Sequence, residues 1–442
     1  MNLVQSLRLL WRIIRFPLLA FVSYGLLVIG LGFYLFSAKL EPVRYQTHPD
    51  GKLESVSDLS LRPDGQSVLT FYALGDWGTA DQHQKQVALL LDQDLSTVGD
   101  RDISPFVLEA GDNVYENGLA SGWDNPDMMA QLTEVIEESY TDIQYQDAPI
   151  EYHLVAGNHD HLGDMALWET YAEGRFAGQN GTPIIKSYNQ HHPDIADTND
   201  KSEYYALNQS DDLIELPEQI LIDSADALFI AIDSQKMLEL YYRRADNPEL
   251  QVDLDAHWQR LALLASEDRS WTFILAHHPV STFGPHLGKQ DSIPYRLFKT
   301  LLFFVNNYGD LDHPAYQEFI ADFDAFSIQY PLIFIAGHDH SLQLNIVSDT
   351  LLQVVSGAAG KATFVIPGEE TVYAYARRGF VRFDVTPEEL WIEFIDVSDN
   401  QLALYRLKKD EEQIIESGSH DELMSEQSGR YRHYVELQAG SS

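Results

Sequence analysis

The sequence predicts an α/β fold in which helices pack on a mostly buried, parallel sheet and a second, antiparallel sheet follows. Between residues 68 and 275, short apolar runs alternate with helix-like amphipathic segments, which is the pattern of βα units. After residue 340, strand-like runs follow one another with no helix-like segment between them, which is typical of antiparallel strands. Hydrophobic residues make up 45% of the 442, so the chain can bury a sizeable core.

The N-terminal segment 1–40 is predicted to be a transmembrane anchor. It has no charged residue from Phe16 to Ala38, and these 23 residues span a hydrocarbon core of about 30 Å as a helix. Arginines precede the run, so the N-terminus is expected in the cytoplasm and the rest of the chain on the periplasmic or extracytoplasmic side. The alternative is a cleaved signal peptide and a secreted protein, which the length of the apolar run disfavours.

The remaining chain divides into three predicted parts. Residues 41–66 are expected to be a linker, because prolines and glycines interrupt polar residues there. One folded domain is expected over 67–409, and a polar, acidic and flexible tail over 410–442. Two segments, 174–216 and 288–329, interrupt the βα pattern and are interpreted as surface insertions.

The elements of the domain follow from hydrophobic periodicity. Continuous apolar runs predict buried strands, and apolar residues at helical spacing predict helices that pack on them. The strands are expected at 68–74, 105–110, 152–156, 227–232, 271–275 and 332–336, the helices at 82–95, near 128–140 and at 253–266, and the late strands at 341–347, 351–355, 372–375, 380–385, 390–396 and 402–407.

Five of the predicted strands end in the same kind of polar group. The central group follows the run 105–110 and reads Gly-Asp-Asn-Val-Tyr at 111–115. Its aspartate stands at the carboxyl end of a strand, where open α/β sheets present their ligands. We therefore expect one site assembled from distant parts of the chain. The other groups are Gly-Asp-Trp-Gly (75–78), Gly-Asn-His-Asp (157–160), Ala-His-His-Pro (276–279) and Gly-His-Asp-His (337–340).

The side chains at these strand ends point to a metal site. The chain has no cysteine, which excludes disulfides, thiolate ligands and cysteine nucleophiles. Asp, Asn, Tyr and His offer oxygen and nitrogen donors that suit Fe, Zn or Mn. They are too many for one tetrahedral zinc, and they could hold two ions if Asp112 bridges them. Two ions about 3.5–4 Å apart bind phosphate and lower the pKa of a shared water, which is the chemistry of phosphoester hydrolysis.

With these groups in this order, roughly residues 68–408 resemble the calcineurin-like metallophosphoesterases. Within that superfamily the chain resembles the purple acid phosphatases, particularly the small tartrate-resistant type, because Tyr115 stands where those enzymes place an iron-binding tyrosinate. Gly78 replaces the histidine that the broad superfamily usually has in the first group. The motifs that carry the resemblance include Gly-Asn-His-Asp-His-Leu-Gly (157–163), Gly-His-Asp-His-Ser-Leu-Gln (337–343) and Ser-Gly-Ala-Ala-Gly (356–360).

The resemblance implies a four-layer α/β/β/α sandwich of two mixed sheets and a pair of metal ions, Fe(III) with a divalent Fe, Zn or Mn. A metal-bound hydroxide would attack phosphorus in line, and an outer histidine, His159 or His286, would protonate the leaving alkoxide. The implied ligands of the ferric ion are Asp76, Asp112, Tyr115 and His340, and those of the divalent ion are Asp112, Asn158, His277 and His338.

Several histidines have a simpler interpretation. His278 is an alternative ligand to His277, but His277 follows its strand almost directly and is preferred. Five further histidines are expected to be ordinary core residues with hydrogen-bond partners. They are His83, His153, His161, His257 and His313.

The charge of the chain limits its partners. With 68 acidic and 29 basic residues, the net charge of −39 disfavours binding to nucleic acid. It also repels phosphomonoester anions unless the metals and a few cations offset it. The two insertions lie where they could cover the site and set the substrate preference.

The leading prediction is a membrane-anchored acid phosphatase that hydrolyses small phosphomonoesters. The first alternative is a phosphodiesterase or pyrophosphatase that acts on nucleotides or phospholipid headgroups with the same metals. The second is a non-catalytic metal- or phosphate-binding module. The presence of His159 and His286 disfavours the second alternative, because binding alone needs no proton donor.

Overall fold

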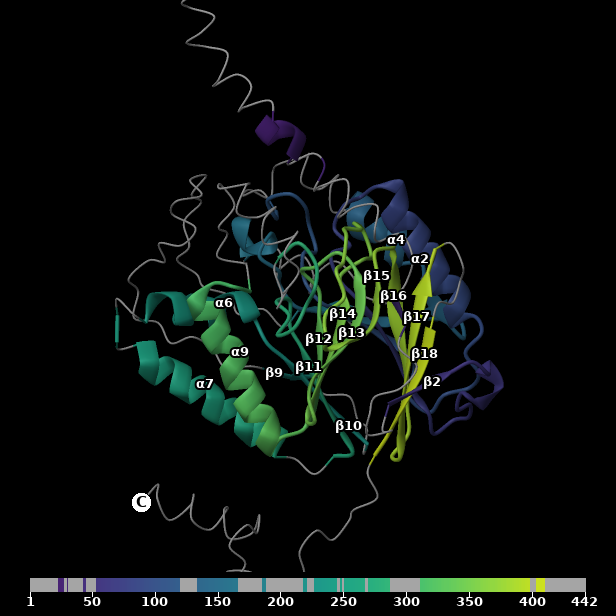
Figure 1. Cartoon of the computed structure of the whole chain (residues 1–442). Helices are drawn as coiled ribbons and strands as arrows, with labels where there is room; N and C mark the ends of the chain where they lie inside the picture. Colours follow the sequence, from purple (N-terminus) through teal and green to yellow (C-terminus); the bar gives the residue numbers. More distant parts are fainter. Residues whose placement is uncertain are drawn as a thin grey trace, which may run out of the picture.

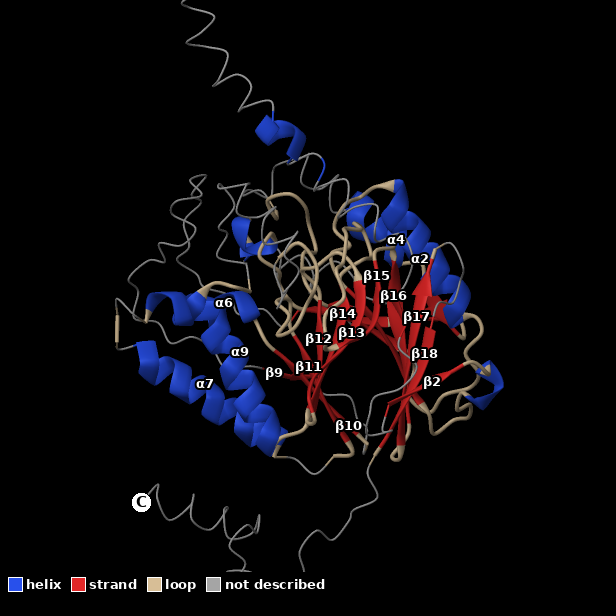
Figure 2. Ribbon diagram, viewed as in Figure 1, coloured by secondary structure: helices blue, strands red, loops and turns tan. Residues whose placement is uncertain are grey.

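In the computed structural model, two eight-stranded mixed sheets lie against each other and helices cover both outer faces (Figure 1). Figure 2 shows the strands of both sheets as a central double layer between two groups of helices. The α/β/β/α order that the family resemblance implied is therefore present. The structure describes residues 23–27, 30, 43–44, 53–119, 133–165, 185–187, 218–220, 226–244, 247–248, 250–266, 269–286, 311–397 and 403–409.

The first sheet has a parallel centre with antiparallel strands at its edges. Strands β10 (Ala227–Ala231), β11 (Trp271–Leu275), β12 (Leu332–Ala336) and β14 (Leu351–Ser356) run parallel to one another. Around them lie the antiparallel strands β9 (Glu218–Ile220), β13 (Leu342–Ser348), β15 (Thr371–Tyr375) and β1 (Val43–Arg44), in the order β1-β15-β13-β14-β12-β11-β10-β9.

The second sheet combines the early parallel strands with the last strands of the chain. Strands β3 (Leu69–Leu74), β4 (Phe106–Glu109), β7 (Glu151–Leu154) and β8 (Ile185–Ser187) are parallel. Strand β3 pairs on its other side with an antiparallel group formed by β16 (Gly379–Val385), β17 (Glu389–Asp396), β18 (Ala403–Lys408) and β2 (Leu53–Val56).

The core between the sheets explains why the central strands are apolar on both faces. Phe71 of β3 packs edge-on against Phe229 of β10 and Phe273 of β11, with ring centroids 5.1 Å apart in each case. All residues of β3, β4, β11 and β12 are buried, because the partner sheet covers one face and helices cover the other. Burial on both faces removes the alternation of polar and apolar residues, so these strands read as continuous apolar runs.

The outer helices each bury one face. Helix α2 (Gln82–Leu95) covers the second sheet and begins at Asp81, whose side chain accepts hydrogen bonds from the amides of His83 and Gln84. Short helical turns η2 (Thr133–Glu137) and α4 (Glu138–Tyr140) lie on the same face. Helices α6 (Ser234–Arg243), α7 (Leu250–Ala265) and α9 (Pro314–Gln329) cover the first sheet.

Small elements complete the described part of the chain. Strands β5 (Gln144–Tyr145) and β6 (Ala148–Pro149) form a short hairpin. The 3₁₀ turns are η1 (Leu59–Leu61) and η3 (Asp160–Leu162), and the second of these belongs to the third polar group of the sequence.

Three sequence predictions about the fold are wrong. The strands after residue 340 do not form a sheet of their own, because β13, β14 and β15 join the first sheet and β16, β17 and β18 join the second. The predicted linker 41–66 contributes β1 and β2 to the sheets. The predicted insertion 288–329 ends in α9, which is a core helix of the outer layer with Tyr316, Phe319 and Phe323 fully buried.

Other predictions fall on residues that are not described. These are most of the predicted anchor 1–40, most of the segment 174–216, and the tail 410–442. Among the described residues, no helix is long and apolar enough to cross a membrane.

Candidate metal centre

The five polar groups meet at the carboxyl ends of β3, β4, β7, β11 and β12. Three residues of these turns have a left-handed backbone although they are not glycine: Asp76 (φ 59°), Asp112 (φ 60°) and His338 (φ 69°). Such residues are uncommon and cluster at functional sites, where the surrounding structure holds them in place. Each directly follows a glycine that ends its strand or turn. The backbone is thus bent to bring these three side chains into one place.

Close approach of the turns requires some of the glycines. A Cβ on Gly157 would lie 2.2 Å from Oδ1 of Asp112, and a Cβ on Gly337 would lie 2.6 Å from Oδ2 of Asp76. The amide of His338 also donates to Oδ2 of Asp76, over 2.8 Å. The turns of the two sheets are therefore in direct contact at the site.

One group of donor atoms surrounds Asp76. The hydroxyl of Tyr115 donates to Oδ1 of Asp76 at 2.8 Å and lies 3.1 Å from Nε2 of His340. Nε2 of His340 is 3.3 Å from the same carboxylate oxygen. Asp76, Asp112 and His340 each offer a ligand atom within 4.8 Å of the others. These contacts bring together the four residues that the resemblance assigned to a ferric ion.

A second group of donor atoms surrounds His277. Its Nδ1 donates to the carbonyl of Ala110 at 2.7 Å, so its Nε2 carries a lone pair. That Nε2 lies 2.9 Å from Oδ1 of Asn158, 3.2 Å from Nδ1 of His338 and 3.4 Å from Oδ1 of Asp112. Electron-rich atoms converge here on one point, which is the arrangement that a cation stabilises. The donor set of both groups therefore fits two metal ions of the Fe, Zn or Mn type.

Asp112 is the residue that belongs to both groups. It is buried, and its Oδ1 accepts the backbone amide of His159 at 2.9 Å. Burial disfavours its ionised form, but the neighbouring imidazoles of His277 and His159 and the hydrogen bonds that the carboxylate accepts outweigh burial and lower the pKa of Asp112 to about 2. The carboxylate is therefore ionised and available to both groups, as a bridging ligand must be.

Tyr115 has the opposite electrostatic environment. Burial and the negative charges of Asp112 and Asp76 raise the pKa of the Tyr115 hydroxyl well above its usual value of 10. Burial opposes the charged form of His340, but the hydrogen bond to Asp76 and the negative charges of Asp76 and Asp112 together outweigh burial and raise the pKa of His340. Without a cation, the phenol therefore keeps its proton.

Two predicted outer histidines flank these groups. Nδ1 of His159 donates to the carbonyl of Glu116 at 2.5 Å, and its Nε2 lies 4.0 Å from Oδ2 of Asp112. The side chain of His159 is 27% exposed, so solvent and ligands can reach it. The ring of His286 packs on the ring of His338 with centroids 4.0 Å apart, and burial lowers the pKa of His286. All nine predicted site residues thus lie in one connected set.

The alternative ligand His278 faces a different environment. Its Nδ1 lies 3.0 Å from Oγ of Ser234, and its Nε2 is buried with no hydrogen-bond partner. Burial lowers the pKa of His278 well below its usual value, so the ring is neutral. His278 also offers an atom within 4.8 Å of ligand atoms of His277 and His338. His277 remains the better-placed ligand, because it alone of the adjacent pair contacts Asn158 and Asp112.

Several residues that support the site carried no signal in the sequence. Oγ of Ser234, in the first turn of α6, accepts the backbone amides of His277 at 3.2 Å and His278 at 2.9 Å. Asp233, at the end of β10, binds Nε2 of His161 at 3.0 Å. Burial opposes the charge on His161, but Asp233 outweighs it and raises the pKa of His161. The interpretation of His161 as an ordinary core residue therefore missed an ion pair beside the site.

Two buried aspartates organise the turns. Asp160 accepts the amides of Asn113, Val114 and Gly157, over 2.9–3.0 Å, and so joins the turns after β4 and β7. Asp339 accepts the amides of Gly284 and His286 at 3.2 Å each. Asp339 thereby ties the segment that carries His286 to the turn that carries His338 and His340. Both aspartates are inside recognised motifs, but no spacing rule identified their role.

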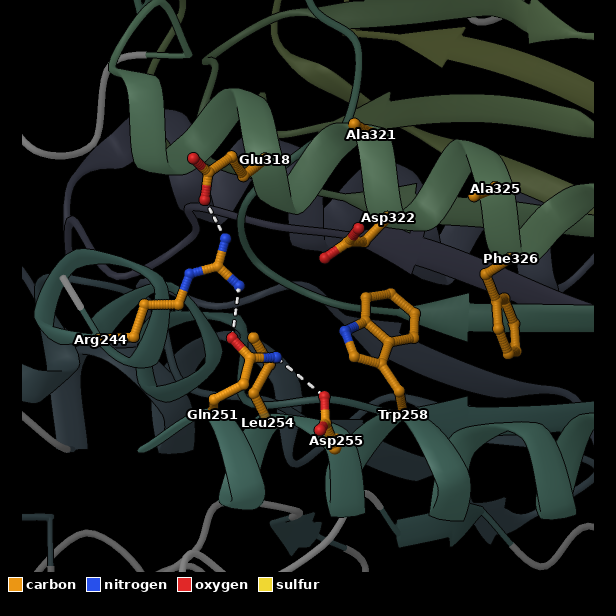
Figure 3. A pocket seen from close by; sticks show the side chains of 10 residues that line it. All are labelled: Arg244, Gln251, Leu254, Asp255, Trp258, Glu318, Ala321, Asp322, Ala325 and Phe326. Atoms are coloured by element: carbon orange, nitrogen blue, oxygen red, sulfur yellow. Dashed lines mark hydrogen bonds and ion pairs between the residues drawn. The ribbon is translucent and has the colours of Figure 1, made fainter. Parts of the chain in front are cut away.

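A surface cavity elsewhere on the molecule has no part in this centre. It has a volume of about 550 Å³ and lies between α7 and α9 (Figure 3). Arg244 in this cavity forms an ion pair with Glu318 and a hydrogen bond with Gln251. None of its lining residues belongs to the two donor groups.

Comparison with known proteins gives the same family as the motifs. The family model of the calcineurin-like phosphoesterases matches residues 69–342, which is more than half of the chain. Purple acid phosphatase 4 of Arabidopsis thaliana is 24% identical over 371 residues, which cover 81% of this chain and 89% of that protein. Tartrate-resistant acid phosphatase type 5 of Oryctolagus cuniculus is 23% identical over 357 residues, which cover 77% of this chain and 91% of that protein.

Among solved structures, the chain is similar to GAP50, described as the anchor in the inner membrane complex of Plasmodium. The TM-score is 0.50 at 15% sequence identity, and the match covers 78% of this chain and 90% of that one. This likeness concerns the fold alone.

Proposed function

The chain belongs to the calcineurin-like phosphoesterase family and is a metal-dependent phosphoric ester hydrolase, and we propose that it is a binuclear-metal acid phosphatase of small phosphomonoesters. The observation that carries this proposal is the position of Asp112 between two groups of oxygen and nitrogen donors. The contact of Tyr115 with Asp76 and His340 supports the purple acid phosphatase type.

The ligands follow from the two groups. Asp76, Asp112, Tyr115 and His340 would hold Fe(III). Asp112 would also hold the second, divalent ion of Fe, Zn or Mn together with Asn158, His277 and His338. When bound, the two ions would orient the phosphate, lower the pKa of a water molecule and stabilise the leaving oxygen.

The chain itself supplies orientation and a proton. The hydrogen bond from Nδ1 of His277 to Ala110 fixes the tautomer that leaves Nε2 free to bind metal. His159 is proposed as the proton donor, because its side chain is partly exposed, its Nδ1 is held by the carbonyl of Glu116, and its Nε2 lies 4.0 Å from Oδ2 of Asp112. His286 is proposed to contact the phosphate as a neutral ring, since burial lowers its pKa.

The proposal is tested with purified residues 41–442 and p-nitrophenyl phosphate, with and without a chelator. Hydrolysis should depend on metal and be maximal at mildly acidic pH. Asp112→Ala should lower kcat/KM by at least about 1,000-fold, because both ions lose a ligand. Asp349→Ala, which removes an exposed carboxylate of a β-turn, is the matched control and should keep full activity. Turnover that survives chelation, or that Asp112→Ala leaves intact, would exclude the proposal.

We also propose that residues 1–40 attach the enzyme to a membrane with the hydrolase domain outside the cytoplasm. The uncharged run from Phe16 to Ala38, with arginines before it, supports this proposal. The full chain should sediment with membranes and resist extraction by alkaline carbonate, whereas residues 41–442 should stay in solution. If the full-length chain were instead shortened at its N-terminus and secreted, that result would favour cleavage of a signal peptide.

A further inference from the structure

A lysine lies against the candidate centre. Nζ of Lys361 is 3.3 Å from the centre of the Tyr115 ring, in the geometry of a cation–π contact. The same Nζ is 3.3 Å from Oε1 of Glu116. The ring beneath it carries the hydroxyl that contacts Asp76 and His340. A positive charge is thus held beside the donor groups, on the Tyr115 ring that His159 also contacts.

The position of Lys361 is fixed by the turn that follows β14. The amides of Ala359 and Gly360 donate to the carbonyls of Gly75 and Asp76, at 3.1 Å each. A Cβ on Gly360 would lie 2.6 Å from the carbonyl oxygen of Asp76, so only glycine fits this close approach. Nε of Arg378 holds the carbonyl of Gly360 from the other side, at 3.0 Å. The backbone next to Lys361 is therefore part of the same rigid assembly as Asp76.

The side chain of Lys361 is partly exposed, and its ion pair with Glu116 is weak. The side chain of Lys361 is 29% exposed, and that of Glu116 is 72% exposed. An ion pair with so exposed a partner contributes little to stability, so an arriving anion can compete with Glu116 for the ammonium. The need for a cation is clear, because the chain has 68 acidic and 29 basic residues and would otherwise repel anionic substrates.

We propose that Lys361 is a substrate-binding residue that selects phosphomonoester dianions over phosphodiester monoanions. The inference rests on the proposed phosphatase function and names its substrate class. A monoester carries one more negative charge and one more terminal oxygen than a diester. The ammonium group of Lys361, with three N–H donors, can bind that additional oxygen, whereas in a diester the second ester group takes its place.

A purely structural role for Lys361 makes a different prediction. If Lys361 only held Glu116 and its turn in place, Glu116→Gln would have the same effect as loss of the lysine. If Lys361 binds substrate, Glu116→Gln removes the competing carboxylate and leaves phosphate affinity equal or higher. The two roles therefore predict opposite results for one conservative variant.

The experiment compares Lys361→Met, Lys361→Arg and Glu116→Gln with the wild type and with Lys85→Met. Lys85 is the matched control, because it pairs with Glu138 in an exposed ion pair on α2 and its loss changes the net charge equally. Steady-state kinetics use p-nitrophenyl phosphate and bis(p-nitrophenyl) phosphate. Calorimetry measures the affinity of each metal-loaded variant for inorganic phosphate, independently of turnover.

Lys361→Met should lower phosphate affinity and monoester kcat/KM by about 10- to 100-fold, mainly through KM, since it removes a charge-assisted hydrogen bond. In the same variant, kcat/KM for the diester should fall by less than about threefold. Lys361→Arg should retain most of the monoester activity, and Lys85→Met should match the wild type. Equal losses on both esters, or Glu116→Gln behaving like Lys361→Met, would overturn the inference. If the wild type hydrolyses neither ester, the phosphatase proposal fails, and the calorimetric comparison still decides the role of Lys361.

Discussion

At the scale of single residues, Tyr115 shows how strongly the centre depends on a cation. Its hydroxyl lies between the carboxylates of Asp76 and Asp112, and burial together with these charges raises its pKa well above 10. A metal ion at this position would reverse the balance, because its positive charge would attract the phenolate and offset the repulsion by the two carboxylates. The ionisation of Tyr115 is therefore a direct report of metal binding.

We expect the Tyr115 hydroxyl to stay protonated in the metal-free protein, and the ferric form to show a visible charge-transfer band. Tyr115→Phe should abolish this band completely, because it removes the only described tyrosine hydroxyl that contacts Asp76. Tyr145→Phe, which removes a hydroxyl bound to the carbonyl of Gly99, is the control and should leave the band unchanged. Absorption spectra at equal iron content make the measurement, and a band that persists in Tyr115→Phe contradicts the assignment.

The predicted site residues lie at strand ends, whereas the residues that sequence reasoning missed support the site through contacts with other turns. Eight of the nine predicted residues lie in polar groups that directly follow apolar strands, so strand position and donor chemistry pointed to them, whereas the family resemblance implied their individual roles and His286. Ser234, Asp339 and Lys361 act through contacts with other turns: Ser234 holds backbone amides, Asp339 holds the segment of His286, and Lys361 packs on Tyr115. Such contacts depend on three-dimensional neighbours, which spacing along one chain does not reveal.

At the scale of elements, the strands that were predicted most clearly from the sequence are those buried on both faces. Strands β3, β11 and β12 are covered on both faces, so their continuous apolar runs marked them clearly. Helix α2 was predicted from its apolar periodicity with its observed bounds, and the structure shows that Asp81 caps its start. Helix α9 was read as part of an insertion rich in aromatic residues, although Tyr316, Phe319 and Phe323 recur at helical spacing and form its buried face.

The allocation of the late strands to two sheets could not be predicted. A strand's periodicity states which residues are buried, but it does not state which strand pairs with it. Strand β14 joins the first sheet through parallel pairing with β12, and β16 joins the second through antiparallel pairing with β3. Helix α6 was also missed, because it is only ten residues long and directly follows the end of β10.

Helix α6 carries a prediction on pH. Glu239 is 6% exposed, and burial raises its pKa to about 7 from its usual 4.5, although His161 and a hydrogen bond from Gln235 oppose this. The folded pKa is above the unfolded pKa, so the unfolded state ionises first and the carboxyl destabilises the fold as pH rises from 4.5 to 7. The cost is absent below this window and fully present above it.

We therefore expect Glu239→Gln to raise the free energy of unfolding by about 2–4 kcal/mol at pH 8 and by less than about 1 kcal/mol at pH 5. Urea unfolding at the two pH values measures the difference. Glu369→Gln, at an exposed turn, is the control and should change stability equally little at both. An increase in the free energy of unfolding that is the same at both pH values would contradict a raised pKa of Glu239.

At the scale of the whole molecule, the dominant feature is the net charge of −39. It opposes the approach of any phosphate anion, and salt screens this repulsion beyond about 10 Å at 0.1 M. The metals and Lys361 act within a few ångströms, where screening is weaker. Salt should therefore weaken the long-range repulsion of substrate by the whole protein more than the short-range attraction of substrate by the centre.

We expect kcat/KM for p-nitrophenyl phosphate dianion to rise about two- to fivefold as ionic strength increases from 10 to 150 mM. The value of kcat/KM for the monoanionic diester should rise less, because the negatively charged protein repels a monoanion less strongly than a dianion. Rates at constant pH with an inert salt such as sodium chloride make the test. A fall in kcat/KM with salt would show that the local positive charge of the centre outweighs the field of the body.

The pairing of β3 with β16 has a consequence for how the enzyme is made. Strand β3 presents Asp76, yet one of its two neighbours is Gly379–Val385, and β17 and β18 continue the same sheet to residue 408. Because β16 is synthesised after β3, the sheet beside Asp76 has an open edge until residues 379–385 have been added. Metal uptake should therefore follow the addition of β16, in the compartment where folding of this sheet ends. The metal supply of that compartment then decides which ions the enzyme receives.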